Sequence, residues 1–183
     1  MVTTVVRDRQ TTEVLDGIRV IRISYPRYAG MLEPSGLKDR LEKIFCKIDP
    51  DIVHAHHAFS PMGLASGWAA KNLGIPAILT NHSIPIGYEA FKYVWNVLSK
   101  IFTLHSALNN LRKYDSIIAV SKLAAEYIHL FYSGRIYIVP PSISDDFFGV
   151  QATKEDIGFE EDDKIVIFVG RPAPKKGLEF ALY

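Results

Sequence analysis

Short runs of β-branched residues alternate along this chain with longer stretches of helical period. The runs are apolar on both sides, which is typical of strands buried in a parallel sheet, and the stretches between them place apolar residues three and four positions apart. The predicted strands are residues 2–6, 18–23, 51–55, 75–80, 116–121 and 136–139, and the predicted helices are 36–48, 60–74, 85–113 and 122–132. This order predicts an α/β fold, a Rossmann-like parallel sheet with helices on both faces.

Some of these elements carry more specific expectations. The strand at 18–23 alternates apolar residues with Arg19 and Arg22, so we expect it near a sheet edge. Ser60, followed by Pro61, is a typical start for the helix at 60–74. Cys46 is the single cysteine, and its apolar neighbours in the helix at 36–48 predict a buried structural thiol.

The stretch from 85 to 113 has an apolar arc that covers about half of a helix circumference or more. Such an arc suits a helix covered on two sides, or one that touches a membrane or a partner. We favour the core interpretation because the polar side carries only two lysines between residues 92 and 107.

Composition narrows the functional classes. A net charge of +1 gives no bulk attraction for nucleic acid, so no nucleic-acid partner is predicted. The first ten residues lack the apolar core of a signal peptide and no run of about 18 apolar residues occurs, which predicts a cytoplasmic protein. Asn81-His82-Ser83 matches the glycosylation acceptor pattern, and without a secretory signal we interpret that match as accidental.

The residue composition of the sequence changes from Pro140 onward. The segment up to Asp163 is rich in proline, glycine, serine and acidic residues, and "KIVIFVG" at 164–170 then reads as another buried strand. The sequence therefore predicts a lobe over 1–145, a linker over 146–162, and the first strand-loop-helix of a second lobe over 163–183.

The loop after this last predicted strand reads "GRPAPKKG". Backbone amides between a parallel strand and the next helix form an anion site, and Arg171, Lys175 and Lys176 would add positive charge beside Gly170. The loop matches neither the Walker pattern nor Gly-x-Gly-x-x-Gly. An ordinary strand-to-helix turn with solvated lysines remains the alternative.

Histidines follow two neighbouring predicted strands. His54 and His56 lie two apart and share one face of their strand, His57 begins the following loop, and His82 comes directly after the next strand. Open α/β sheets bind ligands at this carboxyl edge, so we expect the two loops to converge on one crevice and to hydrogen-bond a polar substrate. Two alternatives stay open. One is a metal site, although no carboxylate or cysteine lies beside the imidazoles, and the other is a structural role with His54 buried and His57 solvated.

Taken in order, these segments resemble the family 4 glycosyltransferases of the GT-B fold. The likeness runs through "DIVHAHHAFSPMGLASGWAAKNLGIPAILTNHS", "AVS", "IYIVPPSISDDFF" and "IFVGRPAPKKGLEFAL", which is nearly the whole chain. Its most specific pieces are His-x-His, Asn-His-Ser and Gly-Arg-x4-Lys-Gly. In such enzymes two Rossmann-like lobes face each other across a cleft, the first holding the acceptor and the second holding a nucleotide-sugar donor.

The resemblance also implies site roles. It places Arg171 and Lys176, at the Gly170 turn, on the donor diphosphate, where they supply the charge that a metal supplies in other transferases. It makes His82 the catalytic residue beside the transferred sugar.

On the same grounds the resemblance places Ser83, His56 and His57 on the acceptor and sugar side. It implies a retaining, metal-independent transferase with no cofactor besides its nucleotide-sugar co-substrate. The implied partners are that donor and a carbohydrate or lipid-linked acceptor, with weak association at the membrane periphery as a further expectation.

The departures from the family pattern shape the final hypothesis. The chain begins at what resembles the second strand, without the first strand and its glycine-rich loop, and the family's Pro-Asn-Gly turn reads Pro140-Pro141-Ser142. The acidic motif of the second lobe, two glutamates eight apart, is absent. We therefore expect a truncated glycosyltransferase lobe that is inactive alone, with an exposed sheet edge that favours homo-oligomers. The alternatives are a non-catalytic binding module or partner subunit, and a metal-dependent hydrolase built on His54, His56 and His57.

Overall fold

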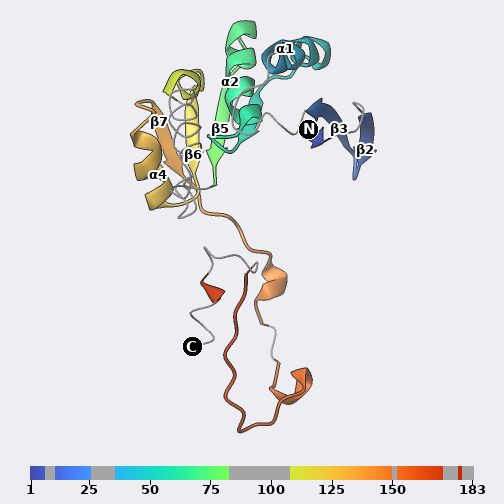
Figure 1. The fold of residues 1–183 in the computed structure, drawn as a ribbon, viewed down its shortest axis with the longest axis vertical. Coiled ribbons are helices and arrows are strands. Elements are labelled where there is room, and N and C mark those ends of the chain that lie inside the picture. Colours follow the sequence, from blue (N-terminus) through green and yellow to red (C-terminus); the bar gives the residue numbers. More distant parts are fainter. Residues whose placement is uncertain (7–10, 26–35, 83–107, 150–151, 171–176, 179–183) are drawn as a thin grey trace, which may run out of the picture. The chain divides into compact units, whose positions relative to one another are not determined.

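The structure is a computed structural model that describes residues 1–6, 11–25, 36–82, 108–149, 152–170 and 177–178 (Figure 1). The chain divides into two compact units, Met1–Pro140 and Pro141–Tyr183, which we describe separately. The first unit holds β1 (Val2–Val6), β2 (Thr11–Leu15), β3 (Ile18–Tyr25), α1 (Leu37–Ile48), β4 (Val53–His56), α2 (Pro61–Leu73), β5 (Ala77–Asn81), β6 (Ser116–Ala119), α4 (Lys122–His129) and β7 (Arg135–Ile138).

The centre of the first unit is a four-stranded parallel sheet in the order β4-β5-β6-β7. Each strand lies beside its neighbour in sequence, and the register pairs His56 with Thr80 and Asn81 with Ala119. The parallel α/β sheet predicted from the alternating pattern is confirmed.

One face of this sheet carries most of the hydrophobic core. Alternate residues of the strands point into it, and they pack with the apolar sides of α1, α2 and α4; the contributing residues include Val53, Ala55, Ala77, Leu79, Ile117, Leu41, Leu64 and Ile128. The helix predicted over 85–113 lies outside the described residues except for a helical end at 108–111.

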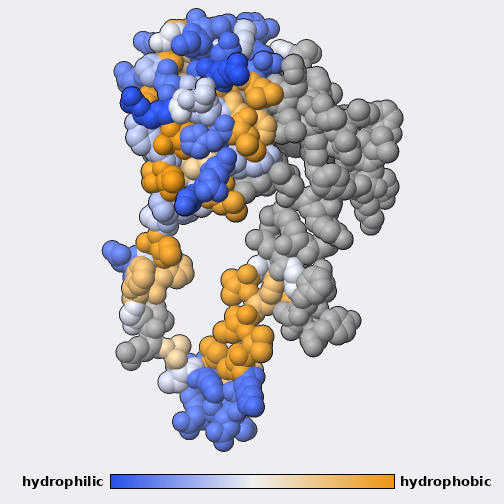
Figure 2. All heavy atoms as spheres, turned by 90° about the vertical axis from the view of Figure 1, so that its left-hand side faces the viewer, coloured by the Kyte–Doolittle hydropathy of each residue, from blue (hydrophilic) through white to orange (hydrophobic). Residues whose placement is uncertain are grey.

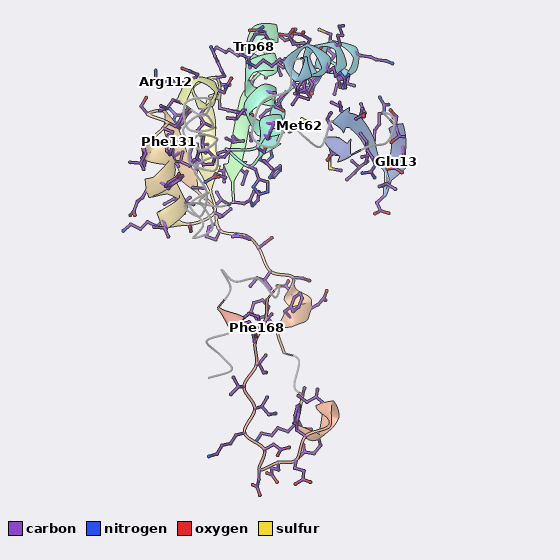
Figure 3. All side chains as sticks on the ribbon, in the orientation of Figure 1. Glu13, Met62, Trp68, Arg112, Phe131 and Phe168 are labelled. Carbon is purple, nitrogen blue, oxygen red and sulfur yellow. The ribbon has the colours of Figure 1, made fainter. Side chains whose placement is uncertain are left out.

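Helix α2 forms where its terminal residues predicted it. The Ser60 hydroxyl accepts a hydrogen bond from the Gly63 amide, Pro61 follows the cap, and Gly74 ends the helix with φ of 71°. Trp68 of α2 lies under Lys38 of α1, whose Nζ is 4.9 Å from the ring centroid (Figure 3). The contact between Lys38 and Trp68 joins α1 to α2.

A second sheet in the first unit has the order β1-β3-β2, with β3 parallel to β1 and antiparallel to β2. The strand at 18–23 was expected near a sheet edge; β3 is the central strand of this three-stranded sheet, and β2 is the edge strand beside it. Strand β2 was not predicted. Its signal is the turn Asp16-Gly17, where both residues have positive φ, as a tight hairpin requires.

Cys46 corrects another expectation, since its thiol is exposed. The buried stripe of α1 runs through Leu37, Leu41 and Phe45. One further residue turns the helix by about 100°, which carries Cys46 out of that stripe.

The second unit contains two short 3₁₀ turns, η3 (Asp145–Phe147) and η4 (Glu155–Ile157). The buried strand predicted at 164–170 is not formed there. Val166 and Val169 are 84% and 91% exposed, and Figure 2 shows an apolar run on this unit. A strand needs a neighbour for its ladder hydrogen bonds, and the described residues of this unit pair none with it.

Across the part of the chain that the structure describes, no helix is long and apolar enough to cross a lipid bilayer. The predicted boundaries at 145 and 162 stay a prediction.

Candidate active site

The candidate site lies at the carboxyl ends of β4 and β5. These strands are parallel neighbours, so the loops that leave them emerge at the same edge of the sheet. β4 ends at His56 and is followed by His57, whereas β5 ends at Asn81 and is followed by His82.

Strand β4 presents its histidines away from the core. Val53 and Ala55 are buried, while His54 and His56 are exposed. His54 Nε2 lies 2.7 Å from Thr80 Oγ1, so the imidazole is hydrogen-bonded to the neighbouring strand. The structural alternative predicted that His54 is buried and hydrogen-bonded. The hydrogen bond is present, but the side chain is exposed.

His56 and His82 are in direct contact. His56 Nδ1 lies 2.8 Å from His82 Nε2, and the ring centroids are 5.1 Å apart with the ring planes 23° from parallel. The His57 ring centroid is also 5.1 Å from that of His82. The structure thus brings together the imidazoles that the sequence placed on two separate loops.

The environment favours the neutral form of both imidazoles. Partial desolvation, followed by the nearby imidazoles of His54 and His57, lowers the pKa of His56 below its ordinary value. The pKa of His82 is lowered by desolvation and then by His56 and His57. Neutral imidazoles can donate or accept a hydrogen bond, which suits contacts to sugar hydroxyls.

The loop between β4 and α2 is held by backbone contacts at both ends. The His57 amide donates to Thr80 O on β5 at 2.9 Å, and the Ser60 amide donates to His57 O at 3.0 Å. His57 has φ of 67°, a left-handed conformation that is uncommon outside glycine. A β-carbon at Gly63 would lie 2.4 Å from His57 O, so this close approach requires glycine.

Asn81 is a residue of the site that sequence analysis did not assign. Its side chain is 1% exposed, and within the described residues neither its amide nitrogen nor its amide oxygen has a hydrogen-bond partner. An asparagine at the carboxyl end of the strand was the available signal.

The other predicted site residues fall partly outside the described residues. Ser83, Arg171 and Lys176 lie outside the described residues. Gly170 is described in the second unit, where it is exposed. Within the described ranges, no group of three or more histidine, cysteine, aspartate or glutamate side chains is arranged to hold a metal ion.

Comparison with known proteins identifies the family. The family model for Glycosyltransferase Family 4 matches residues 2–147. The chain belongs to Glycosyltransferase Family 4.

Relatives of this family 4 chain include two curated proteins. It is 25% identical over 138 residues to a D-inositol 3-phosphate glycosyltransferase of Segniliparus rotundus, a match that covers 72% of this chain and 30% of that protein. It is 27% identical over 149 residues to an alpha-monoglucosyldiacylglycerol synthase of Acholeplasma laidlawii, covering 72% of this chain and 36% of the relative. The family 4 chain therefore matches about a third of the length of each.

A solved structure supports the fold. The family 4 chain is similar to a sucrose-phosphate synthase from Thermosynechococcus elongatus, with a TM-score of 0.50 and 16% identity over 74% of this chain and 70% of that one. The likeness agrees with the GT-B type of α/β sheet expected from the sequence.

Proposed function

We propose that this protein contributes the acceptor-side lobe of a glycosyltransferase that moves a sugar from a nucleotide-sugar donor to an acceptor. The observation that carries the proposal is the contact between His56 and His82, with His57 beside them, at the carboxyl edge of a parallel sheet. Ligands of open α/β sheets bind at this edge. The family membership supports glycosyl transfer as the reaction class.

His82 is the proposed catalytic residue. A neutral imidazole can hydrogen-bond a hydroxyl of the transferred sugar and stabilise charge that develops as the glycosidic bond breaks. His56, His57 and Ser83 lie on the acceptor and sugar side in this proposal. The lowered pKa values of His56 and His82 support it, because they favour the neutral form near pH 7.

Arg171 and Lys176, beside Gly170, are the proposed contacts to the donor diphosphate. Negative charge grows on the leaving diphosphate, so fixed cations aimed at it stabilise the transition state more than the ground state. We propose that these side chains replace a metal ion and that the anomeric configuration of the sugar is retained. The nucleotide-sugar is then the single co-substrate.

The acceptor is proposed to be a carbohydrate or a lipid-linked group. The name of one relative contains an inositol phosphate, and the other relative is named as a synthase of a glucosylated diacylglycerol, so both a polar and a lipid compound occur in these names. A lipid-linked acceptor would bring a cytoplasmic protein to the membrane periphery.

We also propose self-association through an unpaired sheet edge. Among the described residues, β1 has a neighbour only on the β3 side and β4 only on the β5 side. Open edges pair readily with strands of other chains.

The test uses the product of the complete reading frame that contains residues 1–183. Transfer of labelled sugar from a panel of nucleotide sugars to soluble and lipid acceptors is measured for the wild type and for His82→Ala. We expect kcat to fall by about 10²- to 10⁴-fold. Activity within threefold of the wild type would overturn the role of His82.

Two controls accompany this assay. His129→Ala changes a histidine on α4 and should leave transfer unchanged, and chelation of divalent metals should do the same. Isothermal titration of residues 1–183 with the donor should show weak binding or none, because the proposed diphosphate contacts need a second lobe. Tight donor binding by this segment alone would favour a binding module instead.

A further inference from the structure

We infer that His56 is a positioning residue that fixes the orientation and the tautomer of His82 through a direct imidazole-imidazole hydrogen bond. The inference rests on the proposed function for its consequence, because it is His82 that would touch the sugar. It rests on geometry for the bond itself, which joins His56 Nδ1 and His82 Nε2 across 2.8 Å.

A hydrogen bond between two neutral imidazoles links their tautomers. One ring nitrogen must carry the proton and the other must be bare. If His56 Nδ1 donates, His82 carries its own proton on Nδ1, and if His82 Nε2 donates, its Nδ1 is a bare acceptor. In both cases the bond decides whether the remaining nitrogen of His82 donates or accepts.

His56 is the fixed member of the pair. Its strand is paired with β5 up to Thr80, and the amide of the next residue, His57, continues that ladder by donating to Thr80 O. The Ser60 hydroxyl lies 3.3 Å from His56 O and also accepts from the Gly63 amide, which ties the strand end to the start of α2. The His56 backbone is therefore held by two elements at once.

His82 has fewer restraints of its own. It follows the last residue of β5, and within the described part of the chain its one hydrogen bond runs to His56. The plane of its ring lies 23° from that of His56, and its ring centroid lies 5.1 Å from that of His57. Orientation is thus passed from the rigid strand end to the histidine at the loop.

The charges around the pair favour a shared neutral state. His54, with its ring centroid 4.6 Å from that of His56, and His57 are the titratable groups that act on the pair within the described ranges. All of them are imidazoles, so a proton on one disfavours a proton on the next. The hydrogen bond between neutral rings is expected to persist from pH 7 upward.

The decisive experiment is NMR on ¹⁵N-histidine-labelled chain of residues 1–183 at pH 7.5. A scalar coupling between His56 Nδ1 and His82 Nε2, transmitted through the hydrogen bond, should be detected. The two ring nitrogens of His82 should show the separate shifts of one protonated and one bare nitrogen. Absence of the coupling, or averaged His82 shifts in the wild type, would overturn the inference.

Variants separate positioning from general stabilisation. His56→Ala should abolish the coupling and move the His82 nitrogen shifts toward the averaged values of a tautomer mixture. His56→Asn, whose amide can bond near the position of Nδ1, should keep His82 in one tautomer. The matched control is His54→Asn, which changes a histidine on the same face of β4 that bonds Thr80 rather than His82.

The kinetic counterpart uses the complete enzyme. His56→Ala should lower kcat by up to about 100-fold with little change in KM, because His82 loses its orientation. His56→Asn should have a kcat between those of His56→Ala and the wild type. The spectra do not require activity, so the two proposals fail in different ways. If the wild-type chain shows the coupling and the His82→Ala enzyme is fully active, the proposed function alone is overturned. If the wild-type chain lacks the coupling and the His82→Ala enzyme is inactive, the positioning role alone is overturned.

Discussion

Gly67 of α2 lies against the ring of Tyr114 so closely that a β-carbon at position 67 would be 2.4 Å from Tyr114 Cε2. The ring is buried and cannot retreat easily, because its hydroxyl donates to Gly63 O on the same helix. The Tyr132 hydroxyl in turn donates to Tyr114 O at 3.1 Å. This contact fixes the distance between α2 and the segment that leads into β6.

Gly67→Ala should lower the free energy of unfolding by about 1–3 kcal/mol, because the strain of overpacking exceeds the gain in helix propensity. Denaturant unfolding of the first unit measures the change. Lys71→Ala, at an exposed position of the same helix, should stay within about 0.5 kcal/mol of the wild type. Combining Gly67→Ala with Tyr114→Leu should relieve the clash, and strictly additive effects would contradict the predicted contact.

Tyr114 should also give the protein an alkaline limit. Burial raises the pKa of its hydroxyl well above the ordinary value of 10.0. The folded state therefore keeps a proton that the unfolded state loses, so stability that is fully present below pH 10 is lost as the pH rises further.

Tyr114→Phe removes that proton linkage. At pH 8 the variant should be less stable by about 1–2 kcal/mol, since the buried Gly63 carbonyl loses its donor. Above pH 10 the difference between the two proteins should shrink. Unfolding curves measured from pH 8 to 11 test this, and parallel curves would show that Tyr114 does not control the alkaline loss.

The histidine pair predicts the opposite trend on the acid side. The pKa values of His56 and His82 are lowered from 6.5, so the unfolded chain binds protons below that pH that the folded chain does not. Stability should therefore fall as the pH drops from 7 toward 5. The slope of the free energy of unfolding against pH should be smaller in the double variant His56→Asn/His82→Asn.

Asn81→Leu tests the buried carboxamide. Because its polar atoms have no partner among the described residues, an apolar side chain of similar size removes a desolvation cost. We expect a free energy of unfolding equal to or above that of the wild type. A loss of more than about 1 kcal/mol would show that Asn81 is hydrogen-bonded in the folded protein.

Self-association through the unpaired edge of β1 should weaken when one backbone amide at that edge is removed. Met1 O accepts from Ile21 N, so alternate residues of β1 face β3 and Thr4 faces the unpaired edge. Thr4→Pro removes a donor there, which an edge strand tolerates. Sedimentation velocity at rising concentration should show dimers for the wild type and fewer for the variant, and a wild-type monomer at all concentrations would refute the edge model.

Local signals predicted the elements that build the site. The Ser60 cap and the Gly74 stop define α2 without reference to the rest of the chain, and the His-x-His spacing alone puts His54 and His56 on one face of β4. The meeting of His56 with His82 also followed from parallel strand order. The sequence did not predict which ring nitrogens touch, because that depends on the register of His56 against Thr80.

Two of the wrong predictions have a non-local cause. Cys46 was assigned to the core by its neighbours, but the packing of α1 fixes which side of the helix is covered. Ile165 to Val169 has the composition of a buried strand, and composition cannot supply the partner strand that such a segment needs. Strand β2 was missed because a hairpin is recognised from its Asp16-Gly17 turn rather than from apolar content.

The burial of Asn81 has a practical meaning for anyone producing this protein. Oligosaccharyltransferase would recognise Asn81-His82-Ser83 in a chain sent through a eukaryotic secretory pathway, yet the acceptor amide at the end of β5 is buried in the folded protein. A glycan at that position would therefore record that the enzyme reached the chain before β5 had packed. Mass spectrometry of the secreted material would report the order of those two events.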